Sequence, residues 1–183
     1  INKVKQKNFY VVIFHPILNE QKKIKQQLNS LINAINETNI NVLWIYPNTD
    51  MGFKSVIAKL KKSKKKNIKL VSNLERSKFL KILNESSGMI GNSSAGIIEA
   101  SMFKKPVINI GNRQNGRPQS SNIVNTDNLK KNIIKKINYI RSNKKFLKNL
   151  NKCKNPYFKK QSSKIVYKIL NSLKKNDKIF NKY

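Results

Sequence analysis

The chain has 183 residues, which is enough for one substantial hydrophobic core but too few for two typical domains. Its single cysteine, Cys153, excludes a disulfide framework within the chain and is typical of a reducing cytosol, and no apolar run approaches the length that spans a membrane. The net charge of +31 invites a nucleic-acid-binding interpretation.

That charge is carried almost entirely by lysines, which are spread along the chain. Lysine, asparagine and isoleucine are abundant together, as AT-rich codon usage would produce, and aromatic residues are not interleaved with the lysines as stacking on bases would require. We therefore interpret the charge as a solvated surface and expect no specific nucleic-acid partner. A non-enzymatic basic module that binds nucleic acid is the alternative, and it would need its basic residues on one face.

The N-terminal part of the chain alternates apolar runs with stretches of helical periodicity. Continuous apolar runs at residues 9–14 and 42–46 predict strands buried on both faces, and shorter strands are expected at 68–71 and 89–90. Apolar residues at helical spacing predict helices from residue 20 to 35 and over residues 53–60, 75–85 and 94–103.

The C-terminal part continues this alternation. Residues 106–110 predict a fifth strand, a polar loop follows at 111–120, residues 122–124 predict a short sixth strand, and helices are expected near 127–141 and 162–174. The pattern predicts a single α/β domain over residues 1–183, with a Rossmann-like, doubly wound parallel sheet covered by helices on both faces. In such folds ligands bind beyond the carboxyl ends of the strands, where His15, Asn48 and the loops at 91–94 and 111–117 are expected to meet.

The most informative stretch is GNSSAGIIEA, residues 91–100, where an apolar strand runs into a turn of small residues that opens a helix. Ser93 and Ser94 are good N-cap residues, so the backbone N–H groups of the helix start can bind an anion. Small residues, Gly96 among them, let a pyrophosphate approach the backbone. Glu99 lies about one turn further in and is predicted to be free to accept hydrogen bonds from a ribose diol. An ordinary capped helix with a surface glutamate is the alternative.

His15 is the only histidine, and it leaves a buried strand just before a proline. With a pKa near neutrality it could transfer a proton or bind a phosphate as a cation, although a structural role is also open. Arg113 and Arg117 share a glycine-flanked loop and could hold phosphate oxygens, unless the loop is merely solvated. One histidine, one cysteine and few clustered acids predict no metal site, and we expect no other cofactor.

Taken together, these pieces resemble the C-terminal half of the hydrolysing UDP-N-acetylglucosamine 2-epimerases. The matching pieces are His15-Pro16, YPNTD at 46–50, GNSSAGIIEA at 91–100, PVINIG at 106–111, RQNGR at 113–117 and NPY at 155–157. The likeness covers about residues 9–170 and is strongest to the branch that makes N-acetylmannosamine for sialic and related nonulosonic acids. One departure follows residue 157, where the family usually has a glycine-containing turn and this chain has Phe158-Lys159-Lys160.

This resemblance implies a GT-B fold of which the chain is the C-terminal, nucleotide-sugar-binding domain. It implies that Ser93 and Ser94 contact the diphosphate of a UDP-sugar, that Glu99 binds the ribose hydroxyls, and that His15 is catalytic. The family's proposed reaction eliminates UDP to give a glycal, which is then hydrated to the 2-epimer. The acids that move the C2 proton would lie in the N-terminal half of the same enzyme, and the full-length enzyme is expected to be a homo-oligomer.

The C-terminal half of a GT-B glycosyltransferase is the alternative within the same fold, because it uses a similar helix start and a ribose-binding acid. The loop that carries Arg113 and Arg117 favours the epimerase. The chain begins at Ile1, with polar, lysine-rich residues and no signal-peptide core, so we expect a piece of a longer cytoplasmic enzyme. Alone, it is expected to bind UDP without turning over substrate.

Overall fold

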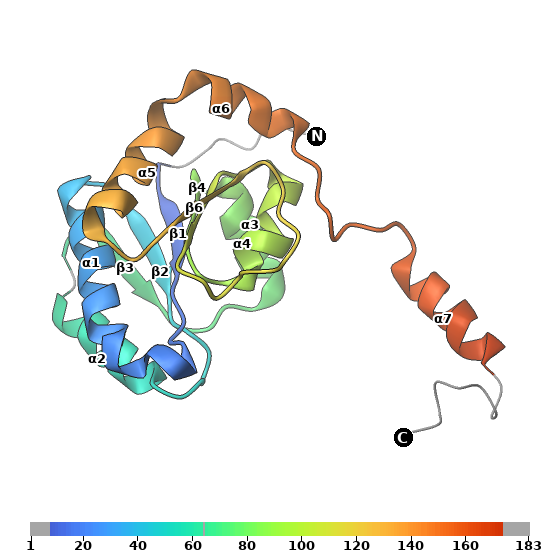
Figure 1. The fold of residues 1–183 in the computed structure, drawn as a ribbon, viewed down its shortest axis with the longest axis horizontal. Helices are drawn as coiled ribbons and strands as arrows, with labels where there is room; N and C mark the ends of the chain where they lie inside the picture. Colours follow the sequence, from blue (N-terminus) through green and yellow to red (C-terminus); the bar gives the residue numbers. More distant parts are fainter. Residues whose placement is uncertain (1–7, 64, 174–183) are drawn as a thin grey trace.

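A parallel, six-stranded sheet forms the centre of the computed structural model, which describes residues 8–63 and 65–173 (Figure 1). The strands are β1 (Tyr10–Ile13), β2 (Val42–Ile45), β3 (Ile68–Val71), β4 (Gly88–Gly91), β5 (Val107–Ile110) and β6 (Ile123–Thr126). They are ordered β3-β2-β1-β4-β5-β6, and each neighbouring pair is parallel. The sheet therefore confirms the predicted doubly wound α/β fold.

Helices cover both faces of this sheet (Figure 1). The helical segments are η1 (Leu18–Lys23), α1 (Ile24–Glu37), α2 (Phe53–Ser63), α3 (Arg76–Glu85), α4 (Ser94–Ile98), η2 (Ala100–Phe103), α5 (Lys130–Ser142), α6 (Lys144–Asn149), η3 (Leu150–Lys152) and α7 (Ser162–Ser172), where η marks a 3-10 turn. One apolar cluster joins α1, α2 and α5 to the sheet, and a second joins α3, α4 and η2 to its other face.

Alternation along β1 explains how one strand serves both clusters. Val12 packs in the cluster with α1, and Val11 and Ile13 pack in the cluster with α3 and α4. All four residues of β1 are buried, because the strand lies at the centre of the sheet between β2 and β4. A strand buried on both faces requires a continuous apolar run, so the sequence of residues 9–14 alone was enough to predict this strand.

The helices differ from the prediction in four places. The predicted helix at 94–103 is divided by Glu99 into α4 and the 3-10 turn η2, and the helix expected from residue 20 begins with the 3-10 turn η1. Helix α6 was not predicted. Helix α5 begins at Lys130 rather than near residue 127, because the Asp127 carboxylate accepts a hydrogen bond from the Leu129 N–H in a turn before it. The predicted end of α7 at Lys174 lies outside the described residues.

At Gly91, β4 approaches β1 too closely for a side chain. The φ of Gly91 is +139°, and a Cβ atom built there would lie 1.9 Å from the carbonyl oxygen of Ile13. The N–H of the next residue, Asn92, donates to the same oxygen at 3.2 Å. A glycine therefore lets β4 end directly against β1 before the chain turns into α4.

We expect Gly91→Ala to lower the free energy of unfolding by more than about 3 kcal/mol, because a strained φ alone costs about 1–3 kcal/mol and the new Cβ also meets backbone. Gly116→Ala is the matched control, since Gly116 has a φ of +77° and nothing within 4 Å of a built Cβ. It should show only the conformational cost. Urea denaturation measures both, and equal losses would contradict the close approach at Gly91.

Candidate functional site

A cavity of about 400 Å³ opens at the carboxyl ends of the strands, beside the point where the strand order reverses between β1 and β4. In doubly wound sheets this is where ligands bind, because the loops that follow the two central strands diverge there. The lining residues are Ile13, His15, Ile45, Tyr46, Asn48, Asn73, Leu74, Arg76, Phe79, Ser93, Ser94, Ala95, Glu99 and Arg113. The cavity thus brings together most of the side chains that the sequence singled out.

His15 follows β1 and is almost fully buried at one side of this cavity, only 4% exposed. Its backbone N–H donates to Asn92 Oδ1 at 2.7 Å, and Asn92 Nδ2 donates to its carbonyl oxygen at 2.9 Å. On the imidazole, Nδ1 accepts a hydrogen bond from the Asn48 N–H at 3.4 Å and lies 3.9 Å from the Asp50 carboxylate. An accepting Nδ1 is unprotonated, so the neutral ring carries its proton on Nε2.

The electrostatic surroundings favour that neutral form. Burial, followed by the nearby Arg113 guanidinium, lowers the pKa of His15 to about 4, against the opposing effect of the Asp50 carboxylate. The contact with Asp50 is therefore not an ion pair at neutral pH, and the predicted pKa near neutrality is wrong for the protein without ligand. A bound anion would favour the protonated ring and raise this pKa.

The start of α4, just after the end of β4, forms part of the cavity wall. Ser93 is the N-cap residue, and its Oγ accepts a hydrogen bond from the Ala95 N–H at 3.3 Å. Ser94 is the first residue of α4, and both serines line the cavity. Gly96 lies outside the lining. A Cβ atom there would lie 2.9 Å from Val107 Cγ1, so Gly96 lets α4 pack against β5 and is not placed to touch a ligand.

Glu99 lies at the C-terminal end of α4, and its carboxylate is not free of partners as the sequence predicted. Its Oε1 accepts a hydrogen bond from Arg76 Nη1 at 2.9 Å. The Arg76 side chain is 72% exposed, whereas that of Glu99 is 12% exposed. An ion pair with so exposed a partner contributes at most about 1 kcal/mol, so a ligand hydroxyl can replace Arg76 at little cost.

Of the two loop arginines, the structure brings only Arg113 into the cavity. Arg113 Nη1 donates to the carbonyl oxygen of Asn92 at 3.2 Å. Burial lowers the pKa of Arg113, the Asp50 carboxylate raises it, and the Arg117 guanidinium lowers it. Arg117 is exposed and is not part of the lining, although it lies close enough to lower the pKa of Arg113.

Sequence reasoning missed three residues that organise this site. Arg76 pairs with Glu99, Asn92 bonds the backbone of His15, and the buried Gln114 donates from Nε2 to the Asn92 carbonyl oxygen at 2.7 Å. Asn92 and Gln114 belong to motifs that the sequence analysis identified. Neither periodicity nor spacing, however, indicates whether an amide side chain is buried or exposed to solvent. Only an invariant pattern across relatives could have marked them from sequence.

Neither a metal site nor a membrane span is evident in the part of the chain that the structure describes. Within residues 8–63 and 65–173, no three histidine, cysteine, aspartate or glutamate side chains gather closely enough to hold a metal ion. None of the described helices combines the length and the hydropathy that crossing a bilayer requires.

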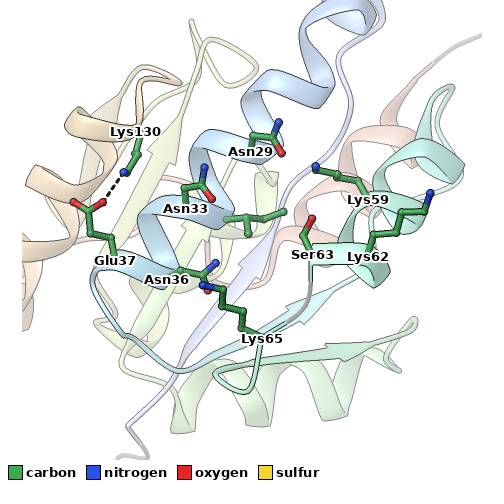
Figure 2. Close-up of a pocket in the computed structure, with 10 residues that line it drawn as sticks. Asn29, Asn33, Asn36, Glu37, Lys59, Lys62, Ser63, Lys65 and Lys130 are labelled. Carbon is green, nitrogen blue, oxygen red and sulfur yellow. Dashed lines mark ion pairs between the residues drawn. The ribbon is translucent and has the colours of Figure 1, made fainter.

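A larger cavity of about 690 Å³ lies between α1, α2 and the start of α5 (Figure 2). Its lining is mostly asparagine and lysine: Asn29, Ile32, Asn33, Asn36, Glu37, Lys59, Lys62, Ser63, Lys65 and Lys130. Lys130 Nζ lies 2.5 Å from Glu37 Oε2 at the left of this cavity in Figure 2. The cavity contains none of the predicted site residues and lies away from the strand-order reversal. We therefore place the candidate functional site at the smaller cavity.

Comparisons with known proteins agree on one family. A family model described as UDP-N-acetylglucosamine 2-epimerase matches residues 1–171. A UDP-N,N'-diacetylbacillosamine 2-epimerase (hydrolyzing) of Legionella pneumophila is 36% identical over 124 residues, which cover 66% of this chain and 32% of that protein. The polysialic acid biosynthesis protein P7 of Escherichia coli is 31% identical over 159 residues, covering 85% of this chain and 40% of that protein. The chain thus spans less than half the length of these relatives.

A solved structure shows the same fold. The UDP-GlcNAc 2-epimerase of Methanocaldococcus jannaschii, in complex with UDP-GlcNAc and UDP, superposes with a TM-score of 0.68. The two chains share 16% sequence identity, and the match covers 93% of this chain and 46% of the other. The arrangement of strands and helices described here is therefore that of one part of a longer chain of this fold.

The buried, neutral His15 predicts how stability depends on pH. Between pH 6.5 and about 4 the unfolded chain binds a proton at this residue and the folded chain does not, so lowering the pH through this window favours unfolding. Moving a pKa from 6.5 to about 4 corresponds to a loss of at most about 3 kcal/mol. Urea denaturation from pH 7 to pH 4 should show this loss in the wild type and not in His15→Gln. The same pH dependence in both proteins would contradict it.

Proposed function

Because the chain belongs to the UDP-N-acetylglucosamine 2-epimerase family, we propose that it is the nucleotide-binding half of a hydrolysing 2-epimerase. The observation that carries the proposal is the single cavity in which His15, Ser93, Glu99 and Arg113 meet. These side chains come from three different strand ends, and together they offer the groups that a nucleoside diphosphate sugar requires. The proposed substrate is a UDP-N-acetylamino sugar.

In the proposed complex, each part of the nucleotide has a partner of suitable chemistry. The Glu99 carboxylate accepts hydrogen bonds from the ribose diol in place of Arg76. The hydroxyls of Ser93 and Ser94, with the backbone N–H groups beside them, donate to the diphosphate. Arg113 supplies a positive charge on the same side, and Arg117 adds to the positive potential at the rim of the cavity.

In the proposed reaction, a base removes the proton from C2 of the sugar while the bond between C1 and the UDP oxygen breaks. The electron pair of the C2–H bond forms the C1–C2 double bond of a glycal, and UDP leaves. Water then adds to C1 and a proton returns to C2 from the opposite face, which gives N-acetylmannosamine or a related 2-epimer. The leaving diphosphate gains negative charge, and the Nε2–H of His15 is proposed to donate a hydrogen bond to it.

The base that acts at C2 is proposed to come from outside this chain. Glu99 is the only carboxylate among the described lining residues, and its proposed partner is the ribose. Asp50 is not among the lining residues, and its carboxylate lies 3.9 Å from His15 Nδ1. Because general acid–base catalysis needs the group within hydrogen-bond reach of the reacting carbon, we propose that an N-terminal half of the same enzyme faces this cavity and supplies it.

The rival functions fit the observations less well. A GT-B glycosyltransferase would share the sheet and the helix start, but the family match over residues 1–171 favours the epimerase. A nucleic-acid-binding module would need its lysines on one face, whereas they lie throughout the sequence. We further propose a cytoplasmic, homo-oligomeric enzyme that serves sialic or related nonulosonic acid synthesis. The names of the Legionella and Escherichia relatives support that branch.

Replacing the proposed ribose ligand should weaken nucleotide binding. Losing a charge-assisted hydrogen bond costs about 1.5–3 kcal/mol, so Glu99→Ala should raise the dissociation constant for UDP roughly ten-fold or more. Glu75→Ala is the matched control, because Glu75 is an exposed carboxylate next to Arg76 that does not line the cavity. Isothermal titration calorimetry gives both constants, and an unchanged affinity in Glu99→Ala would reject this role.

Turnover should require more than the present chain. The 183-residue protein is expected to bind UDP and to release neither UDP nor N-acetylmannosamine from UDP-N-acetylglucosamine, whereas the full-length enzyme should release both. In the full-length enzyme, His15→Ala should lower kcat far more than it lowers the affinity for UDP. Product analysis by chromatography decides this. Turnover by the chain alone, or full activity without His15, would place the chemistry elsewhere.

A further inference from the structure

We propose that Asn92 is the positioning residue of this site: it holds His15 and Arg113 in fixed places at the cavity. Asn92 is fully buried and is not part of the cavity lining, so it acts through these two neighbours and not by touching a ligand. The ligand on which His15 and Arg113 act is that of the proposed function, so this part of the inference rests on that proposal. The role of Asn92 in holding the two residues rests on the contacts alone.

Both ends of the Asn92 side-chain amide are hydrogen-bonded to the backbone of His15. Its Oδ1 accepts from the His15 N–H at 2.7 Å, and its Nδ2 donates to the His15 carbonyl oxygen at 2.9 Å. The register of β1 and β4 pairs Ile13 with Gly91, where the ladder ends. Beyond that point the side-chain amide of Asn92 makes the hydrogen bonds to His15 that a neighbouring strand backbone would make. These bonds fix the segment that carries the imidazole.

The backbone of Asn92 holds the third strand end. Its carbonyl oxygen accepts from Arg113 Nη1 at 3.2 Å and from Gln114 Nε2 at 2.7 Å, while its N–H donates to the Ile13 carbonyl oxygen at 3.2 Å. Gln114 is 1% exposed, so this anchor of the loop after β5 is shielded from water. One residue thus connects the ends of β1, β4 and β5.

Only asparagine meets these demands among residues of its size. Aspartate can accept from the His15 N–H, but its second oxygen, when ionised, cannot donate to the His15 carbonyl. Alanine leaves both buried backbone groups of His15 without a partner, and each such group costs about 1–3 kcal/mol. Serine is too short to reach both groups, although a water molecule can bridge the gap.

The environment of His15 follows from this arrangement. Burial of the ring and the Arg113 guanidinium both lower the pKa of His15, and the Asp50 carboxylate opposes them. The Asn48 N–H donates a hydrogen bond to Nδ1. Without the Asn92 amide, the segment after β1 loosens, water reaches the ring, and the ring leaves its fixed place beside Arg113. The pKa of His15 should then rise towards its ordinary value of 6.5.

The test uses the fact that His15 is the only histidine, so that one imidazole signal in the NMR spectrum reports its titration. The variants are Asn92→Ala and Asn92→Ser. The matched control is Asn122→Ala: Asn122 is equally buried and donates from Nδ2 to the Lys105 carbonyl oxygen at 2.7 Å, outside the cavity lining. Urea denaturation measures the stability that each variant loses.

The wild type and Asn122→Ala should titrate near pH 4, whereas both Asn92 variants should titrate more than one pH unit higher. UDP should bind at least five-fold more weakly to the Asn92 variants and unchanged to the control. Folded Asn92 variants with the wild-type titration and UDP affinity would overturn the proposal. If neither Asn92 variant folds, Asn92 is needed for the fold itself, and the proposal is likewise overturned.

These readouts separate the two proposals. If the wild type binds no UDP, the proposed function fails, and the titration of His15 in the three variants still decides the role of Asn92. If UDP binds to every variant with the wild-type affinity and His15 titrates as in the wild type, the role of Asn92 fails while the proposed function stands.

Discussion

The site depends on the contact between the ends of β1 and β4, where the two backbones meet with no space for a side chain at Gly91. Because Gly91 lets β4 end against Ile13, the next residue, Asn92, reaches the backbone of His15 with both ends of its amide. From there the chain enters α4, so Ser93 and Ser94 face the same cavity as the imidazole. A wider spacing of these strands would separate the serines from His15.

Neighbouring charges also set the protonation of the groups at the cavity. Burial and the Arg113 guanidinium lower the pKa of His15, and the Asp50 carboxylate opposes them only in part. Glu99 is held across the cavity by Arg76, whose exposed side chain a ligand can displace. Without ligand, the cavity thus contains a neutral His15, the Arg113 guanidinium and the Glu99 carboxylate, which is paired only with an exposed arginine. Binding a diphosphate would favour the protonated His15 and so link nucleotide binding to pH.

The high positive charge and the larger cavity between α1 and α2 illustrate why composition and size alone do not locate a site. The groove between α1 and α2 is larger than the strand-end cavity, yet it is lined mainly by asparagine and by lysines such as Lys59 and Lys62 at the surface of the helices. The strand-end cavity is smaller, but the segments that follow β1, β2, β3, β4 and β5 all bring side chains to it. Convergence of strand ends, and not volume or charge, distinguishes the candidate site.

The sequence by itself determined the sheet, the strand-to-helix unit at residues 91–100 and the sheet edge at which the candidate site lies, because continuous apolar runs and capping serines are local signals. Only the tertiary structure decided which side chains meet. It paired Glu99 with Arg76, kept Arg117 outside the cavity and gave Gly96 a packing contact with Val107. It also lowered the pKa of His15 and placed the Asn92 amide against the His15 backbone, since burial and contacts between residues 77 positions apart leave no periodic trace in one sequence.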